Sequence, residues 1–151
     1  MKERISVAGV AVRTFPQEPR RQKFFVARRL SGGSLGGKWE FPGGKVESGE
    51  TDQEALIREF QEELAVPVEV GSFIGETEFI HGDTLFTLRF YRITLLSDDY
   101  TLTAHSEWRW VSMDEMIQLD FAESDRKLFP AIIKKRESLK TSVFRDLPLK
   151  N

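Results

Sequence analysis

Three glutamates, Glu59, Glu62 and Glu63, lie within five residues of one another in segment 58–66, which reads REFQEELAV. On a helix with 3.6 residues per turn, their carboxylates occupy an arc of roughly 100°. Carboxylates this close repel each other by a few tenths of a kcal/mol per pair when exposed, and by more when water is excluded. Because clustered oxygen ligands suit Mg²⁺ or Mn²⁺, the spacing indicates a divalent-metal site.

The acidic arc borders the apolar stripe of the same helix. The residues of this stripe are Leu56, Ile57, Phe60 and Leu64. Glu63 is therefore expected at the edge of the core, where its charge requires a nearby cation. The alternative is an ordinary solvated face, because glutamate is a good helix former. Zinc is not favoured, since the chain has no Cys and its two histidines, His81 and His105, are far from this segment in sequence.

The elements that must position these side chains follow from periodicity, capping and turn signals. A helix is expected from Thr51 to Leu64, with a capping box between Thr51 and Glu54 and with Pro67 after its end. The preceding segment 31–50 contains seven glycines and is predicted to be a long functional loop around one short strand, KWEF. Strands are expected at 5–14, 21–30, 68–81, 84–96 and 107–113.

The last third of the chain is predicted to be helical. A short helix is expected near 114–118. A basic amphipathic helix is expected from Ser124 to about Leu139, with Pro130 as a kink. Its predicted inward residues are Leu128, Phe129, Ile132 and Ile133. Segment 140–151 has no interpretable pattern.

Length and composition restrict the class of protein. The 151 residues are expected to form one domain, 1–151, with a core and an active site. A net charge of -2 gives no global attraction for duplex nucleic acid or anionic membrane. The N-terminal apolar run is interrupted by Arg13 and is interpreted as a strand, not a signal peptide, and no run of eighteen apolar residues indicates a membrane helix. The absence of Cys fits a reducing compartment, so a cytoplasmic monomer or homodimer is expected.

Segment 44–66, GKVESGETDQEALIREFQEELAV, resembles the Nudix box. The box has Gly, five residues, Glu, seven residues, and then Arg-Glu-apolar-any-Glu-Glu-any-Gly-apolar. The matching positions are Gly44, Glu50, Arg58, Glu59, Phe60, Glu62, Glu63 and Val66. Six fixed charged or glycine positions match by chance at roughly one in a million or less. Ala65 departs from the pattern, because the box has glycine there.

The flanking segments WEFPGGKVESGE (39–50) and VARRL (26–30) resemble the MutT branch of the family, small hydrolases of nucleoside triphosphates. The resemblance covers roughly residues 4–137. It implies an α/β Nudix fold, in which a mixed curled sheet is sandwiched between helices as an α/β/α arrangement. This fold agrees with the order of elements predicted above.

The resemblance also implies the metal site and its chemistry. Metal ions in this family bind the box glutamates and the substrate diphosphate, so Glu59, Glu62 and Glu63 would be the ligands, helped by backbone carbonyl near Gly43 and Gly44. A divalent ion neutralises phosphate charge and lowers the pKa of water. The two glycines let backbone approach an ion closely; alternatively they form a turn that needs positive φ.

The resemblance also implies roles for further residues, each of which has an alternative. Arg58 and Glu50 are expected to pair with each other or with the ligand carboxylates and to orient them. Glu107 matches a glutamate that acts as base or extra ligand in relatives, or it is a surface glutamate. The general base is not assigned.

The substrate contacts come from the same resemblance. Arg29 lies twelve residues before Phe41, the spacing of an arginine that contacts substrate phosphate in the MutT branch, and both residues are expected at the substrate. Arg28 could take the place of Arg29, or Arg29 is a solvated strand-end residue.

Asp125 matches an asparagine that reads an oxidised guanine. An ionised Asp only accepts hydrogen bonds and would favour donor groups on cytosine or guanine; alternatively, Asp125 caps the last helix. Phe79 and His81 are stacking candidates for the base, with core packing as the favoured alternative for Phe79.

The expected activity is Mg²⁺-dependent hydrolysis of a nucleoside triphosphate, such as 8-oxo-dGTP or (d)CTP, to monophosphate and pyrophosphate. This reaction would sanitise the nucleotide pool and so contribute to DNA repair. Mn²⁺ could replace Mg²⁺ as the metal ion. The alternatives are a Nudix hydrolase of nucleoside diphosphate sugars or RNA 5′-triphosphates, and a Nudix domain that senses a nucleotide without cleaving it.

Overall fold

The computed structural model describes residues 1–33 and 35–135. Its strands are β1 (Lys2–Phe15), β2 (Glu18–Arg29), β3 (Trp39–Glu40), β4 (Gly43–Lys45), β5 (Val68–His81), β6 (Thr84–Leu95) and β7 (His105–Ser112). Its helices are α1 (Asp52–Leu64), α2 (Met113–Met116), α3 (Glu123–Arg126) and α4 (Phe129–Lys134). All five predicted strands and the helix at 51–64 are therefore present, with boundaries shifted by a few residues.

The strands form one mixed sheet in the order β3-β2-β1-β6-β5, and β4 and β7 pair with β1 and β2. β1 is parallel to β6 and antiparallel to β2, so the sheet has both kinds of pairing. The middle of β1, from Val7 to Val12, is buried, as its uninterrupted apolar sequence predicts.

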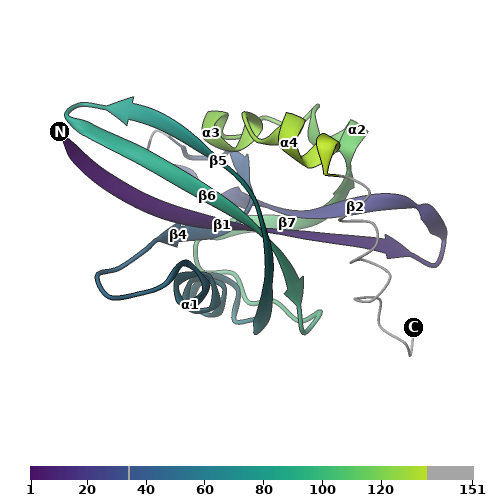
Figure 1. Cartoon of the computed structure of the whole chain (residues 1–151). Coiled ribbons are helices and arrows are strands. Elements are labelled where there is room, and N and C mark those ends of the chain that lie inside the picture. Colours follow the sequence, from purple (N-terminus) through teal and green to yellow (C-terminus); the bar gives the residue numbers. More distant parts are fainter. Residues whose placement is uncertain (34, 136–151) are drawn as a thin grey trace.

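Helices cover both faces of this sheet. α1 lies on one face and α2, α3 and α4 lie on the other (Figure 1). Each face has its own buried cluster, one around Phe60 of α1 and one around Phe41, Phe90 and Phe129. The expected α/β/α arrangement is confirmed.

α1 packs closely against β1 because Gly9 of β1 has no side chain. A Cβ atom at Gly9 would lie 2.8 Å from the Phe60 ring, closer than real contacts allow. Phe60 and Leu64 are fully buried on this face. The apolar stripe therefore determines which way the acidic arc of α1 points.

Both ends of α1 are defined by local contacts. Thr51 caps the first turn, and the reciprocal bond to Glu54 completes the predicted capping box. At the other end Ala65 is left-handed, with φ 53°, and its N–H donates to the carbonyl of Gln61. Among described residues other than glycine, Ala65 alone has positive φ. The helix thus ends where the Nudix pattern has glycine, with alanine in a conformation that glycine adopts more easily.

The prediction of one continuous helix from Ser124 was wrong. The chain forms two short helices, α3 and α4, and Pro130 lies in the first turn of α4, where proline is tolerated. Leu128, Phe129 and Ile132 are buried as expected, but Ile133 is 48% exposed. Residues 136–139 of the predicted helix and the segment 140–151 lie outside the described residues.

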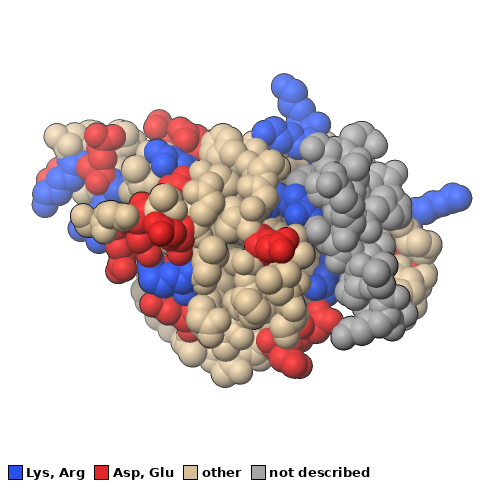
Figure 2. Space-filling model, turned by 60° about the horizontal axis from the view of Figure 1, so that its bottom comes forward, with Lys and Arg blue, Asp and Glu red and all other residues tan. Residues whose placement is uncertain are grey.

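The surface fits the nearly neutral composition. Acidic and basic side chains are interspersed on the face shown in Figure 2. Within 1–33 and 35–135, no helix is long and apolar enough to cross a bilayer.

Candidate active site

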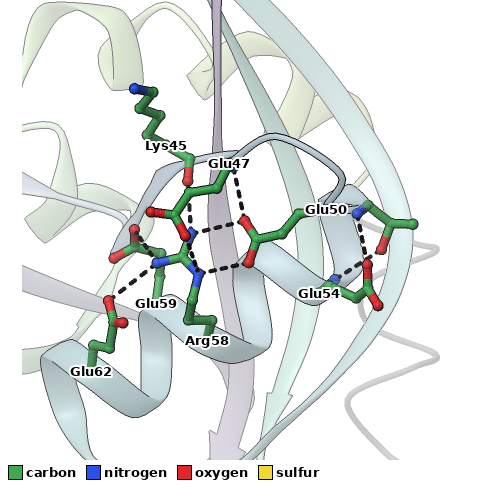
Figure 3. A network of polar contacts seen from close by, with 8 residues as sticks. Lys45, Glu47, Glu50, Glu54, Arg58, Glu59 and Glu62 are labelled. Atoms are coloured by element: carbon green, nitrogen blue, oxygen red, sulfur yellow. Dashed lines mark hydrogen bonds and ion pairs between the residues drawn. The ribbon is translucent and has the colours of Figure 1, made fainter.

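Arg58 of α1 holds the acidic residues around it together. Its Nε and Nη2 atoms donate to Glu50 at 2.6 and 2.9 Å, and its Nη1 donates to Glu59 and Glu62, each at 3.1 Å (Figure 3). Nη2 also donates to the carbonyl of Lys45 in β4. One guanidinium therefore fixes α1 to the preceding loop and strand.

The ion pair between Arg58 and Glu50 shifts the pKa of both groups. The hydrogen bonds from Arg58 lower the pKa of Glu50 to about 2 and raise the pKa of Arg58. Both groups remain charged at neutral pH, so Arg58 offsets part of the repulsion within the acidic arc.

The three box glutamates occupy different environments. The side chain of Glu62 is 60% exposed, whereas that of Glu59 is 14% exposed. Burial, the largest effect, raises the pKa of Glu59 despite the opposing charge of Arg58. Glu63 is affected more strongly, because burial and the neighbouring charges of Glu40 and Glu59 raise its pKa to about 8.

This arrangement fits a divalent cation. Oε1 of Glu63 is buried and has no hydrogen-bond partner among the described residues. A Cβ atom at Gly44 would lie 2.3 Å from the Glu59 carboxylate, so glycine is needed to bring β4 backbone this close to it. Glu59, Glu62, Glu63 and the backbone at Gly44 offer hard oxygen ligands, which suit Mg²⁺ or Mn²⁺. Of these, only Glu63 belongs to the group of acidic and histidine side chains in the described residues whose ligand atoms all lie within 4.8 Å of one another, and its other members are Glu40 and His105.

A pocket of about 170 Å³ opens beside these carboxylates. It is lined from β1 to β6 and from the start of α3, and its lining includes Arg29, Glu40, Gly43, Gly44 and Asp125. The volume is below the roughly 300–1,000 Å³ of sites that enclose a whole drug-sized ligand. The pocket therefore suits one part of a ligand whose charged part lies outside, toward α1.

Comparison with known proteins identifies the family of this chain. The family model of the NUDIX domain matches residues 7–132. The chain belongs to the Nudix family. It is 38% identical over 129 residues to the Mycobacterium tuberculosis H37Rv protein named "Putative 8-oxo-dGTP diphosphatase 2", covering 83% of this chain and 85% of that protein.

A curated relative and a solved structure from Escherichia coli are also similar. The CTP pyrophosphohydrolase of strain K12 is 29% identical over 111 residues, covering 74% of this chain and 82% of that protein. The solution structure of the E. coli ORF135 protein superposes with a TM-score of 0.76 at 27% identity and covers 91% of this chain and 94% of that one. The family and the names of its relatives identify this chain as a hydrolase.

The Nudix glycines do not form a turn. Gly43 and Gly44 lie in β4, paired with β1, and neither has positive φ. A Cβ atom at Gly43 would lie 1.9 Å from the carbonyl oxygen of Val7. The turn alternative was therefore wrong, and close packing is what excludes a side chain at both positions.

Asp125 is a buried residue of the pocket lining. It is 3% exposed, its Oδ2 accepts a hydrogen bond from the backbone N–H of Phe41 at 2.9 Å, and Ser124 lies 3.3 Å from its Oδ1. Burial, with the charge of Glu40, raises the pKa of Asp125 to about 8. The raised pKa favours the protonated carboxyl group over the ionised, accept-only Asp expected from the sequence.

Asp125 does not cap a helix. The residue before α3 is Ala122, the residue before α4 is Leu128, and neither helix has a side-chain cap. The capping alternative was wrong because the predicted helix begins earlier and breaks after Arg126.

Of the two residues proposed to stack on the base, Phe79 and His81, only one lines the pocket. Phe79 is 39% exposed and stacks on Phe86 with ring centroids 4.9 Å apart, and both rings line the pocket. The favoured alternative, that Phe79 packs in the core, is therefore wrong. His81 is exposed at the end of β5 and does not line the pocket.

Phe41 is 2% exposed, and its ring packs against Phe90, Phe121 and Phe129. It also lines the pocket, and its backbone N–H is the group that binds Asp125. Its position therefore combines core packing with a wall of the pocket.

The two neighbouring arginines of β2 have different surroundings. Arg29 lines the pocket and donates to Glu40. Arg28 donates to Glu107 at 3.3 Å and to the carbonyl of Gly37. Glu107 also accepts from Arg109, and its side chain is 37% exposed. The structure therefore favours Arg29 over Arg28 at the substrate and surrounds Glu107 with surface arginines.

Sequence reasoning did not select Glu40 and His105. Both are buried, and one potential ligand atom from each lies within 4.8 Å of the other and of Glu63. The only signal was a charged residue flanked by Trp39 and Phe41, since an acidic residue between buried aromatic residues needs a polar partner.

Proposed function

We propose that this Nudix hydrolase cleaves a nucleoside triphosphate to a nucleoside monophosphate and pyrophosphate with Mg²⁺. The observation that carries the proposal is the unpartnered buried oxygen of Glu63, next to a pocket that ends at Asp125. One end offers ligands for a cation that binds phosphates, and the other offers hydrogen-bonding groups for a base.

Different residues of the chain would bind the cation, orient its ligands and bind phosphate. Glu59 and Glu63 would hold the cation, with Glu62 at the exposed side, and Arg58 holds Glu59 and Glu62 in place. Arg29 would bind phosphate at the pocket rim. A bound Mg²⁺ supplies neutralisation of phosphate charge and acidification of water. Water adds to phosphorus, the phosphoanhydride bond to the leaving pyrophosphate breaks, and one proton is released.

The base would enter between the Phe79–Phe86 stack and Asp125. A protonated Asp125 can donate one hydrogen bond as well as accept, as an amide does. This suits a base edge with an acceptor, such as the oxygen of an oxidised guanine, and 8-oxo-dGTP is our first choice of substrate. (d)CTP is the second choice, because the ionised form of Asp125 would accept from its amino group.

A substrate panel tests the proposal. The purified protein with Mg²⁺ or Mn²⁺ is assayed against normal and oxidised nucleoside triphosphates, nucleoside diphosphate sugars, ADP-ribose and triphosphorylated RNA, with products identified. Release of pyrophosphate and monophosphate from a triphosphate supports it. Preferred turnover of a sugar conjugate or RNA end would replace the substrate class, and no turnover of any member would point to a nucleotide-sensing domain.

A further inference from the structure

Three strands meet at Glu40. It lies in β3, which pairs with β2, and β2 pairs in turn with β7. In that ladder Arg29 of β2 is the partner of His105 of β7, just after a register shift between Arg28 and Arg29. The topology thus brings a carboxylate, a guanidinium and an imidazole together at the pocket.

The contacts among these groups are direct. Nη1 of Arg29 donates to both carboxylate oxygens of Glu40, at 3.1 and 3.3 Å. Nε2 of His105 lies 2.9 Å from Oε2 of Glu40. The side chain of Arg29 is 38% exposed, that of Glu40 is 11% exposed and that of His105 is fully buried. The triad therefore runs from the protein interior to the pocket surface.

Glu40 also connects the two ends of the active site. Its carboxylate lies within 4.8 Å of Glu63 at the metal end. The next residue, Phe41, binds Asp125 at the base end through its backbone N–H. The orientation of Glu40 therefore affects the part of the pocket that lies between phosphate and base.

A metal ion held by Glu40, Glu63 and His105 is the alternative explanation of this cluster. Two observations speak against it. Arg29 already places a cation on both oxygens of Glu40. Nδ1 of His105 is buried without a partner among the described residues, whereas a ligating histidine almost always donates its second ring N–H. An unpartnered ring nitrogen fits better if Nε2 carries the hydrogen and donates it to Glu40.

We propose that His105 is a positioning residue that holds Glu40 and, through Glu40, orients the Arg29 guanidinium for substrate phosphate. This role rests on the proposed function only for the identity of the anion that Arg29 binds. Without the hydrogen bond from His105, the Glu40 carboxylate can rotate and Arg29 loses its fixed partner. A misplaced phosphate contact weakens substrate binding more than it slows the chemical step.

The first test measures how ordered the Arg29 side chain is in the absence of substrate. The Nε–Hε NMR signal of Arg29 is followed in wild type, His105→Leu and His105→Gln. We expect the order parameter of the Arg29 side chain to fall in His105→Leu and to be retained in His105→Gln, because a glutamine amide can still donate to Glu40. An Arg29 signal as ordered in His105→Leu as in wild type would overturn the proposal. If His105→Leu does not fold, Glu40→Gln, which keeps the side-chain volume and removes the charge, must loosen Arg29.

The second test uses steady-state kinetics with the best triphosphate of the panel. We expect His105→Leu to raise KM about tenfold with a smaller change in kcat, and His105→Gln to restore most of the loss. When Arg29 is already replaced by Ala, His105→Leu should change KM little further, because His105 acts through Arg29. Additive losses would contradict the proposal. Arg21→Ala is the matched control, since Arg21 pairs with Glu18 near the β1–β2 turn and lies outside the pocket.

The third measurement separates positioning from metal binding. Mn²⁺ affinity is measured by electron paramagnetic resonance in the same variants. An unchanged affinity in His105→Leu supports positioning, whereas an affinity reduced tenfold or more would make His105 a ligand and overturn it. If wild type hydrolyses no member of the panel, the proposed function fails, and the NMR result still decides whether His105 orders Arg29.

Discussion

At the scale of single residues, identical side chains acquire different properties from their surroundings. Glu62 and Glu63 are neighbours in sequence, yet one is largely exposed and the other has a pKa raised to about 8 by burial and by nearby carboxylates. A carboxylate that is costly to ionise alone becomes favourable beside a divalent ion, because the ion offsets both desolvation and repulsion. The site is therefore prepared for a cation at Glu63 more than at Glu62.

The first prediction concerns Glu63. Glu63→Gln keeps the shape of the side chain and removes its charge, so Mg²⁺-dependent kcat should fall by about 100-fold or more while the fold persists. Turnover of the preferred triphosphate and the circular dichroism spectrum are measured together. Glu69→Gln, an exposed position on β5, is the control and should behave as wild type. Near-normal activity of Glu63→Gln would remove it from the ligand set.

The second prediction concerns base selection by Asp125. Its pKa of about 8 means that raising the pH from 6.5 to 9 converts a hydrogen-bond donor into an acceptor. The ratio of kcat/KM for 8-oxo-dGTP to that for dCTP should therefore decrease as pH rises. Asp125→Asn, which does not titrate, should make this ratio independent of pH. A wild-type ratio that stays constant over the range would exclude Asp125 from base recognition.

The same group gives a stability prediction. The pKa of Asp125 is higher in the folded state than the unfolded value near 3.9, so its contribution to stability is fully present below about pH 4 and is lost as pH rises through about 8. Relative to Asp125→Asn, the wild-type free energy of unfolding should fall by at least about 1 kcal/mol between pH 5 and pH 8. Urea unfolding of both proteins measures the difference, and parallel curves would contradict the raised pKa.

At the scale of elements, α1 is determined by its two ends and by one central ion pair. The capping box starts the helix, Phe60 and Leu64 hold it against the sheet, and Arg58 connects it to Glu50 and β4. The box acids lie in the C-terminal half of the helix, where the helix dipole disfavours negative charge. Arg58 supplies the cation that this half otherwise lacks.

The helix exit yields the next prediction. Left-handed backbone costs alanine roughly 1–2 kcal/mol, and glycine avoids this cost but is more flexible in the unfolded chain. Ala65→Gly should therefore raise the free energy of unfolding by about 1 kcal/mol, measured by urea titration. Ala55→Gly, in the buried interior of the same helix, is the matched control and should lower stability by about 1 kcal/mol or more. A destabilised Ala65→Gly would mean that the Cβ of Ala65 makes contacts worth more than the backbone strain.

At the scale of the whole molecule, we predict that metal binding and folding are coupled. The proposed ligands come from α1 and the strand before it, so they are close only in the folded chain. A cation that binds the folded state alone at 100 times its Kd adds about 2.7 kcal/mol, which corresponds to about 5–10 °C in Tm for a protein of this size. Saturating Mg²⁺ should raise Tm by this amount, EDTA should reverse it, and Glu63→Gln should reduce it. An unchanged Tm in differential scanning calorimetry would argue against a preformed site.

Local sequence determined the acidic helix and its family. The capping box, the apolar stripe and the spacing of Glu59, Glu62 and Glu63 depend on contacts within one helix, so a single segment contains the information. The five long strands were also recognisable from their apolar runs, whereas β4 lies in a segment that was predicted to be a loop.

Only the tertiary structure brought His105 to Glu40 and placed Glu40 and Asp125 in the lining of the pocket. These positions depend on pairing between β2, β3 and β7 and on the break between α3 and α4. The hydrogen bonds between Glu40 and His105 and between Phe41 and Asp125 join residues 65 and 84 positions apart. The raised pKa of Asp125 is likewise a consequence of burial by the assembled chain, since desolvation acts on a carboxyl group only when other elements exclude its water. The sequence by itself thus determined the family and the candidate cation ligands, and the tertiary structure decided which groups line the pocket.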